Sequence, residues 1–194
     1  MRKLILVTLL TGVSLGLSLG LTAQVVNVEG VIVEDHAQLG MRNLVLNGSG
    51  VRRKYIFDIY VAALYLVTKQ SSAAAVLADK GEKRIAMHMV SDLNPGELLY
   101  LFKKAIENNH SEEELAALKK PVGEFEDVFY KMGALNKGDV IDMDYLPGTG
   151  TRVMVNGGLR GMISGDAFYN VLLKIWLGEH PVQEKLKRQL LGGP

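Results

Sequence analysis

The stretch GVRRKYIFDIYVAALYL, residues 50–66, predicts one long strand at the centre of a sheet. Its apolar side chains alternate onto both faces, which is typical of a strand covered on both sides. Arg52, Arg53 and Asp58 are charged, and a buried charge needs a partner. Arg53 and Asp58 fall on opposite faces of a regular strand, and about 20 Å of chain separates Arg52 from Asp58. We therefore expect Asp58 to pair elsewhere and at least one arginine to lack a nearby acid.

The remaining sequence predicts strands, then helices, then strands and a final helical part. Asn94 with Glu97, and Ser111 with Glu114, are helix-capping pairs. Asn156-Gly157 indicates a tight hairpin. The further strands are expected over 25–34, 44–51, 84–90, 139–146, 152–156 and 159–164, and the helices over 71–79, 94–106, 112–120, 121–132, 165–177 and from 181 onward. This order predicts one α+β domain, a mostly antiparallel sheet with helices on one face.

The N-terminal segment resembles an export signal. Arg2 and Lys3 precede an uncharged run, and the small residue Ala23 could precede a cleavage site. We expect residues 1–23 to be a signal peptide, residues 24–194 to be the mature domain, and the protein to be periplasmic. An uncleaved membrane anchor is the alternative, and the segment could then hold the protein near a membrane.

Composition excludes several classes of function. The chain has 22 basic and 21 acidic side chains and no cysteine. This balance argues against nucleic acid as a partner, and the missing cysteines exclude disulfides and thiolate chemistry. No nucleotide-binding glycine motif and no metal-ligand spacing is present, so we expect neither a cofactor nor a metal. We expect His88 to be a satisfied sheet residue. Within the carboxylate group Asp139, Asp142 and Asp144, the last two share a strand face and are expected to meet solvent.

The candidate binding residues come from the opening stretch. An inward-facing arginine offers a fixed fork of donors that suits a carboxylate. Tyr60 shares the face of Arg52 and can bring a hydroxyl to the same cavity. The alternative is an Arg52 that points to solvent or bridges loops.

Three blocks of the sequence resemble the bacterial chalcone isomerase-like family, within the chalcone isomerase and fatty-acid-binding superfamily. They are LNGSGVRRKYIFDIYVAALYL, DYLPGTGTRVMVNG and GDAFYNVLLKIWLGEHPVQEKLKRQLLG, and the resemblance extends from about Gln24 to Gly192. It implies an open-faced β-sandwich, in which a large curved antiparallel sheet and a helical layer enclose a ligand cleft.

The resemblance also implies roles for single residues. Arg52 matches an arginine that chalcone isomerases use, Arg53 could substitute for it, and Tyr60 takes the place of a threonine. The other catalytic positions of the isomerases fall near Leu98, Ala105 and Ile175. With those polar groups replaced, ring closure is not expected.

The resemblance favours an exported, non-catalytic protein that binds a small apolar acid or lipid-like ligand, such as a fatty acid, between sheet and helices. The alternatives are an isomerase or intramolecular lyase acting on another substrate, and a structural or partner-binding protein without a ligand. Large side chains filling the cleft would favour the last, and the candidates are Tyr55, Phe57, Tyr60 and Trp176.

Overall fold

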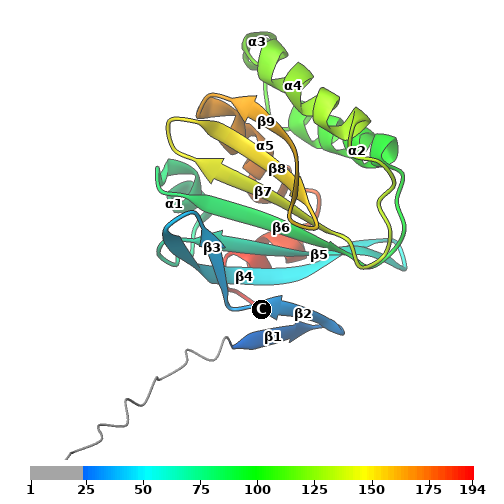
Figure 1. Ribbon diagram of the computed structural model, residues 1–194. Coiled ribbons are helices and arrows are strands. Elements are labelled where there is room, and N and C mark those ends of the chain that lie inside the picture. The colour runs from blue at the N-terminus through cyan, green and yellow to red at the C-terminus, as the bar shows by residue number, and fades with distance from the viewer. Residues whose placement is uncertain (1–23) are drawn as a thin grey trace, which may run out of the picture.

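A seven-stranded antiparallel sheet forms the centre of the computed structural model, which describes residues 24–194 (Figure 1). The predicted signal peptide lies outside these residues. Neighbouring strands of the sheet follow one another in sequence: β3 (His36–Leu39), β4 (Arg42–Lys54), β5 (Phe57–Leu66), β6 (Lys83–Met89), β7 (Val140–Leu146), β8 (Gly150–Val155) and β9 (Gly158–Ser164). A separate hairpin contains β1 (Val25–Val28) and β2 (Val31–Glu34). The prediction of an α+β fold with an antiparallel sheet is confirmed.

Two segments predicted as single strands are hairpins. Residues 25–34 turn at Glu29-Gly30, where both residues have a positive φ. Residues 50–66 turn at Tyr55-Ile56, so that Lys54 lies opposite Phe57. The turn escaped the sequence analysis because it has neither asparagine nor glycine, and its two residues continue the apolar pattern. The predicted strand 44–51 is part of β4, and β3 was not predicted.

The β4–β5 turn is an unusual one. Tyr55 has a φ of +57°, in the left-handed region that bulky residues rarely adopt. Its side chain is 88% exposed, and those of Ile56 and Phe57 are also exposed. A register shift follows the turn, so that Arg53 lies opposite Asp58 and Arg52 opposite Tyr60. This bulge decides which arginine faces which side of the sheet.

Six helices occur in the described residues. They are α1 (Ala73–Ala78), α2 (Pro95–Glu107), α3 (Glu112–Ala117), α4 (Lys119–Tyr130), α5 (Ala167–Leu177) and α6 (Glu184–Leu190). The predicted caps are confirmed: the Asn94 side chain accepts from the Gly96 amide, and Ser111 and Glu114 form a reciprocal capping box. Within residues 24–194, no helix is long and apolar enough to cross a membrane.

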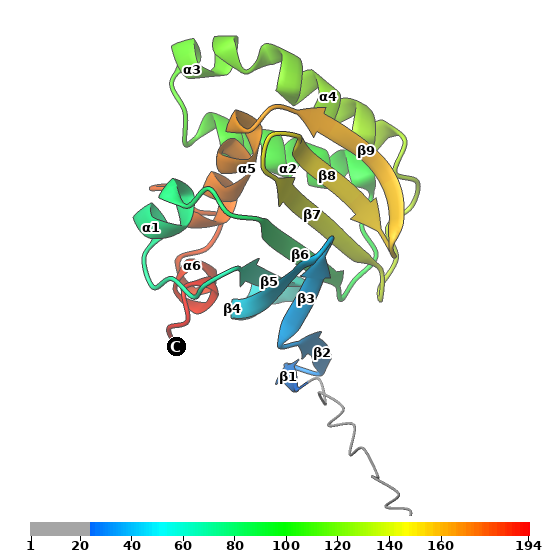
Figure 2. The same ribbon diagram turned by 60° about the vertical axis from the view of Figure 1, so that its left-hand side comes forward.

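The main core lies between the sheet and the helices on one face (Figure 2). Helix α5 packs on β8, α4 packs on β9, and α6 packs on β4 and β5. The opposite face of β4, β5 and β6 carries a smaller apolar cluster, shared with β2 and β3. Both faces of β5 are therefore covered, as its sequence predicts.

Candidate functional site

Arg52 and Tyr60 lie opposite each other on β4 and β5 and face the helical layer. Together they border a small cavity of about 70 Å³ at the end of the main core. Its other lining residues are Lys54, Ile59, Leu93, Glu97, Leu98, Leu101, Phe102 and Val182. The expectation that Arg52 and Tyr60 share a face is confirmed. The contact arises from strand pairing across the hairpin, whereas the sequence analysis placed both residues on one strand.

The Arg52 guanidinium has no acidic partner among residues 24–194. Its Nη1 donates to the main-chain carbonyl of Arg53 at 2.6 Å and to Oε1 of Gln183 at 3.4 Å. Gln183 also accepts from the Arg53 amide, at 2.9 Å, and so ties the connection before α6 to β4. These contacts hold the guanidinium in place while its charge is not neutralised. Such a group at the edge of an apolar cavity suits an incoming carboxylate.

The Tyr60 hydroxyl is a buried donor beside this guanidinium. Trp176 Nε1 donates to Tyr60 Oη at 3.0 Å, and both side chains are buried. Burial raises the pKa of Tyr60 to about 12, so the phenol keeps its proton at neutral pH. Since the oxygen accepts from the indole, its own hydrogen is available for a second partner.

Arg53 lies away from this cavity, on the other face of the hairpin. Its Nε donates to Asp58 Oδ1 at 2.5 Å, and its Nη2 donates to Glu29 Oε2 at 2.8 Å. The hydrogen bond from Arg53 lowers the pKa of Asp58. The expectation that Arg53 and Asp58 cannot share a face is wrong, because the turn makes them cross-strand neighbours. The structure therefore brings Arg52 to the cavity and leaves Arg53 outside it.

Lys54 is a site residue that the sequence analysis did not propose. It lines the cavity with Arg52, and its Nζ lies 3.9 Å from Glu97 Oε1. Their spacing of two residues along β4 puts both on one face, which was the available signal. Lys54 thus adds a second positive charge at the cavity, partly balanced by Glu97.

The family resemblance implies that polar catalytic groups of the isomerases are replaced at three positions of this chain. All three positions lie in apolar surroundings. Leu98 borders the cavity, and Ala105 and Ile175 are buried in the main core. Aromatic rings fill the space beyond: Phe102 meets Trp176 edge to face, with ring centroids 5.4 Å apart. The cleft between sheet and helices is therefore narrow. Of the four large side chains considered as its filling, two are in the core (Tyr60, Trp176) and two are exposed at the β4–β5 turn (Tyr55, Phe57).

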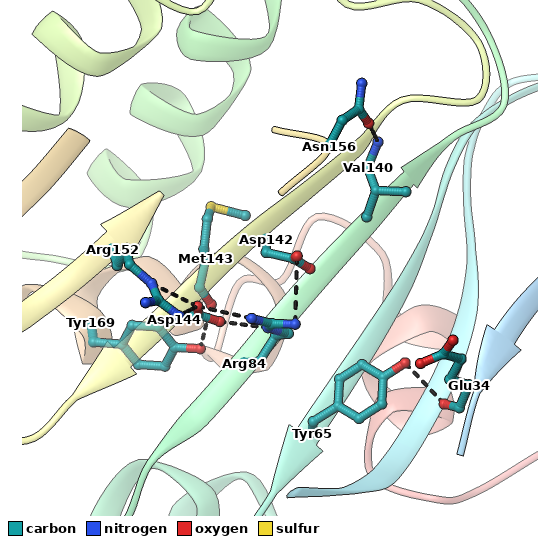
Figure 3. A network of polar contacts seen from close by, with 10 residues as sticks. All are labelled: Glu34, Tyr65, Arg84, Val140, Asp142, Met143, Asp144, Arg152, Asn156 and Tyr169. Atoms are coloured by element: carbon teal, nitrogen blue, oxygen red, sulfur yellow. Dashed lines mark hydrogen bonds and ion pairs between the residues drawn. The ribbon is translucent and has the colours of Figure 1, made fainter. Parts of the chain in front are cut away.

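A network of charged side chains lies on the opposite face of the sheet (Figure 3). Asp144 is fully buried and binds two arginines: Arg84 Nε donates to it at 2.5 Å and Arg152 Nη2 at 2.7 Å. Asp142 is largely buried, with Arg84 Nη1 at 3.5 Å, and burial raises its pKa. The expectation that Asp142 and Asp144 meet solvent is wrong, because arginines from the adjacent strands cover them. Asp139 is half-buried and stands apart from them, where its carboxylate accepts from the Asn136 amide and from the Asn156 side chain.

His88 also differs from its prediction. It lies on the same face as Asp142, and its Nε2 is buried without a hydrogen-bond partner in residues 24–194. Burial lowers the pKa of His88, so the imidazole is neutral at physiological pH. In the described part of the chain, no three His, Asp or Glu side chains are grouped to hold a metal ion.

Comparison with known proteins identifies the fold and the family. The model of the family described as chalcone isomerase-like matches residues 25–192, which confirms the resemblance found in the sequence. A crystal structure of a fatty-acid binding protein from Arabidopsis thaliana is similar, with a TM-score of 0.67 and 17% sequence identity. The match covers 87% of this chain and 96% of that chain. No curated protein sequence matches.

Proposed function

Because this chain belongs to the chalcone isomerase-like family, we propose that it is a non-catalytic member that binds a small apolar carboxylate, such as a fatty acid, beside Arg52 and Tyr60. One observation carries the proposal: a guanidinium without an acidic partner in the described part of the chain and a phenol with an available proton border the same apolar cavity. Both groups donate hydrogen bonds, and a carboxylate has two oxygens that accept them.

The free energies are sufficient for a specific ligand. A hydrogen bond to a charged group contributes about 1.5–3 kcal/mol net, and each buried methylene adds about 0.8 kcal/mol. The cavity of about 70 Å³ holds a carboxylate and the first carbons of its chain. A longer acyl chain enters this space only when Leu98 and Phe102 of α2 move aside. Affinity is therefore expected to depend on chain length.

The structural relative supports the choice of ligand class. The Arabidopsis protein is named a fatty-acid binding protein, and it shares the fold of this chain over most of both lengths. Leu98, Ala105 and Ile175 are buried and apolar, and the family resemblance places the catalytic groups of isomerases near these positions. An apolar acid fits such surroundings better than a polyphenol, whose hydroxyls would need partners.

Arginine substitutions test the proposal directly. Titration calorimetry with hexanoate, dodecanoate and hexanol should show binding of the acids, and Arg52→Ala should weaken it at least tenfold. Arg53→Ala is the matched control: it removes an adjacent guanidinium that lies outside the cavity, so affinity should be unchanged. Tyr60→Phe keeps the ring and removes only the hydroxyl, and should weaken binding about five- to tenfold.

Three results would reject or redirect the proposal. Equal affinity of the Arg52→Ala and Arg53→Ala proteins would place the ligand elsewhere. No uptake of either acid by a folded protein would favour a structural or partner-binding role, with the core closed by its own rings. Turnover of a chalcone by the purified protein would restore the isomerase alternative.

We further propose export to the periplasm, with residues 1–23 as the signal peptide. The charged start and the uncharged run of this segment support the proposal. N-terminal sequencing of protein from a periplasmic fraction should begin at Gln24. Intact Met1 in a membrane fraction would instead support the anchor.

A further inference from the structure

The turn between β4 and β5 exposes three consecutive large apolar side chains, Tyr55, Ile56 and Phe57, which we call the hairpin tip. Tyr55 is 88% exposed, Ile56 83% and Phe57 66%. Within residues 24–194, no other run of three large apolar residues is exposed. Figure 1 shows β4 and β5 meeting at the right-hand end of the sheet. An exposed apolar cluster marks a contact surface, whereas single exposed apolar residues are ordinary.

The backbone of the hairpin tip is strained at its first residue. Tyr55 has a φ of +57°, and glycine would adopt this left-handed conformation without a steric penalty. A tyrosine at this position is therefore unfavourable for folding alone, and strain of this kind concentrates at functional positions. Below the turn, Lys54 pairs with Phe57 and Arg53 with Asp58. The tip is thus presented at the end of a paired hairpin.

The hairpin tip is too small for a stable contact with a second protein chain. Three such side chains present on the order of 500 Å² of surface, whereas each partner of a stable protein interface buries about 800 Å². A lipid bilayer does not require so large a surface, because apolar side chains enter its interfacial region to a shallow depth. Tyrosine is enriched in that region, where its ring lies in the apolar part and its hydroxyl meets water and headgroups.

The charges beside the hairpin tip balance one another. The strand end and the acids that contact it contain three bases and three acids: Arg52, Arg53 and Lys54, and Glu29, Asp58 and Glu97. The side chains of Arg53 and Lys54 are partly exposed, so their apolar stems can lie beside the tip while their charged ends reach lipid phosphates. Because the sum of the charges is zero, the apolar side chains supply the attraction to a bilayer, and anionic lipids add little.

We propose that the hairpin tip inserts into the interfacial region of a lipid bilayer. The tip adjoins the cavity at Arg52, because Lys54 lines that cavity and lies opposite Phe57 in the strand pairing. Insertion therefore places the cavity beside a store of acyl chains. The delivery of a ligand from the bilayer to the cavity rests on the proposed carboxylate-binding function, whereas the bilayer contact itself does not.

Cosedimentation with phosphatidylcholine vesicles tests the contact, with protein from the periplasmic fraction. Binding should be saturable and should change less than twofold between low and high salt, since salt screens only charges. The tip variant, Ile56→Ser with Phe57→Ser, should bind at least tenfold more weakly. Tyr55→Gly should bind about fivefold more weakly, and it keeps the fold because glycine adopts the left-handed conformation readily. Met41→Ser is the matched control and should bind as the wild type does, because Met41 is fully exposed beyond the opposite end of β4.

A local readout separates insertion of the hairpin tip from attachment by another part of the chain. Trp176 is the only tryptophan and is buried, so brominated lipids do not reach it. Brominated phosphatidylcholine should quench the new tryptophan of the Tyr55→Trp protein and leave that of the Met41→Trp protein unquenched, whether or not residues 1–23 remain on the chain.

Four results would overturn the proposal. They are absence of vesicle binding by the wild-type protein, equal binding by the tip variant and Met41→Ser, equal quenching in the two tryptophan variants, and a dimer in ultracentrifugation that the tip variant abolishes. The last result would assign the tip to a second copy of this chain. The affinity of the tip variant for hexanoate, measured by calorimetry, should equal that of the wild type, so the bilayer contact and the proposed function can fail separately.

Discussion

Removal of the Tyr60 hydroxyl isolates the one hydrogen bond that joins the sheet to α5 at the candidate site. The Trp176 indole N–H donates to Tyr60 Oη at 3.0 Å, and both residues are in the main core. Tyr60→Phe keeps the ring and its packing. The variant leaves the Trp176 indole N–H without an acceptor, because the N–H makes no other hydrogen bond within residues 24–194.

The expected loss of unfolding free energy follows from the desolvation of the Trp176 indole N–H. An unsatisfied buried donor costs about 1–3 kcal/mol of unfolding free energy. The Tyr60 phenol proton has no acceptor in the described chain. Removing this unsatisfied donor offsets part of the loss of unfolding free energy. We therefore expect the lower half of the range, about 1–2 kcal/mol. For a domain of this length, that corresponds to a decrease in Tm of about 2–8 °C.

Urea unfolding provides the measurement, because Trp176 is the only tryptophan and reports on its own surroundings. The midpoint should fall while the slope with denaturant stays constant, since the surface exposed on unfolding is nearly the same. Tyr100→Phe is the control, because Tyr100 is an exposed tyrosine on α2. A midpoint shift equal in both variants, or absent in both, would refute the reasoning and show that Tyr60 and Trp176 are not coupled.

Three further predictions concern the sheet. Asp144→Asn should lower the unfolding free energy by about 3 kcal/mol, measured by urea unfolding, because two largely buried guanidiniums lose their shared carboxylate; an unchanged midpoint would contradict this. Gly48→Ala should lower Tm, because a methyl group there would overlap main-chain carbonyl oxygens of α6, whereas Gly123→Ala, with open space around the new methyl, should raise it. The pKa of His88 is lowered by burial, so the unfolded chain binds the proton more readily. Stability should therefore be fully present above about pH 6.5 and decrease as the pH falls below it, and His88→Gln should reduce that slope in pH-dependent unfolding.

The helices and the fold class could be predicted from the sequence because their signals are local. Asn94 and Ser111 place their caps within three residues of the groups they bind, so the printed sequence contains both partners. The blocks that resemble the family lie in order along the chain, and the family match confirms them. Alternation along β5 also predicted apolar side chains on both of its faces, and β5 residues occur in both core clusters.

The turn at Tyr55-Ile56 could not be predicted, because it lacks the asparagine and glycine that usually occupy left-handed positions. The apolar pattern continues through it, so two strands read as one. This turn pairs Arg53 with Asp58 and, within residues 24–194, leaves Arg52 without an acidic partner.

The sequence by itself determined the family, the fold class and the capped helices. The pairing of Arg52 with Tyr60 across β4 and β5 came from a hairpin and a bulge that the sequence pattern does not reveal. Only the tertiary structure decided which charges are neutralised and which are left over. Asp144 is 60 residues from Arg84, and strand pairing alone brings them to 2.5 Å. The physical reason is that ion pairs depend on distance in space, and at a sheet that distance is set by register and turns.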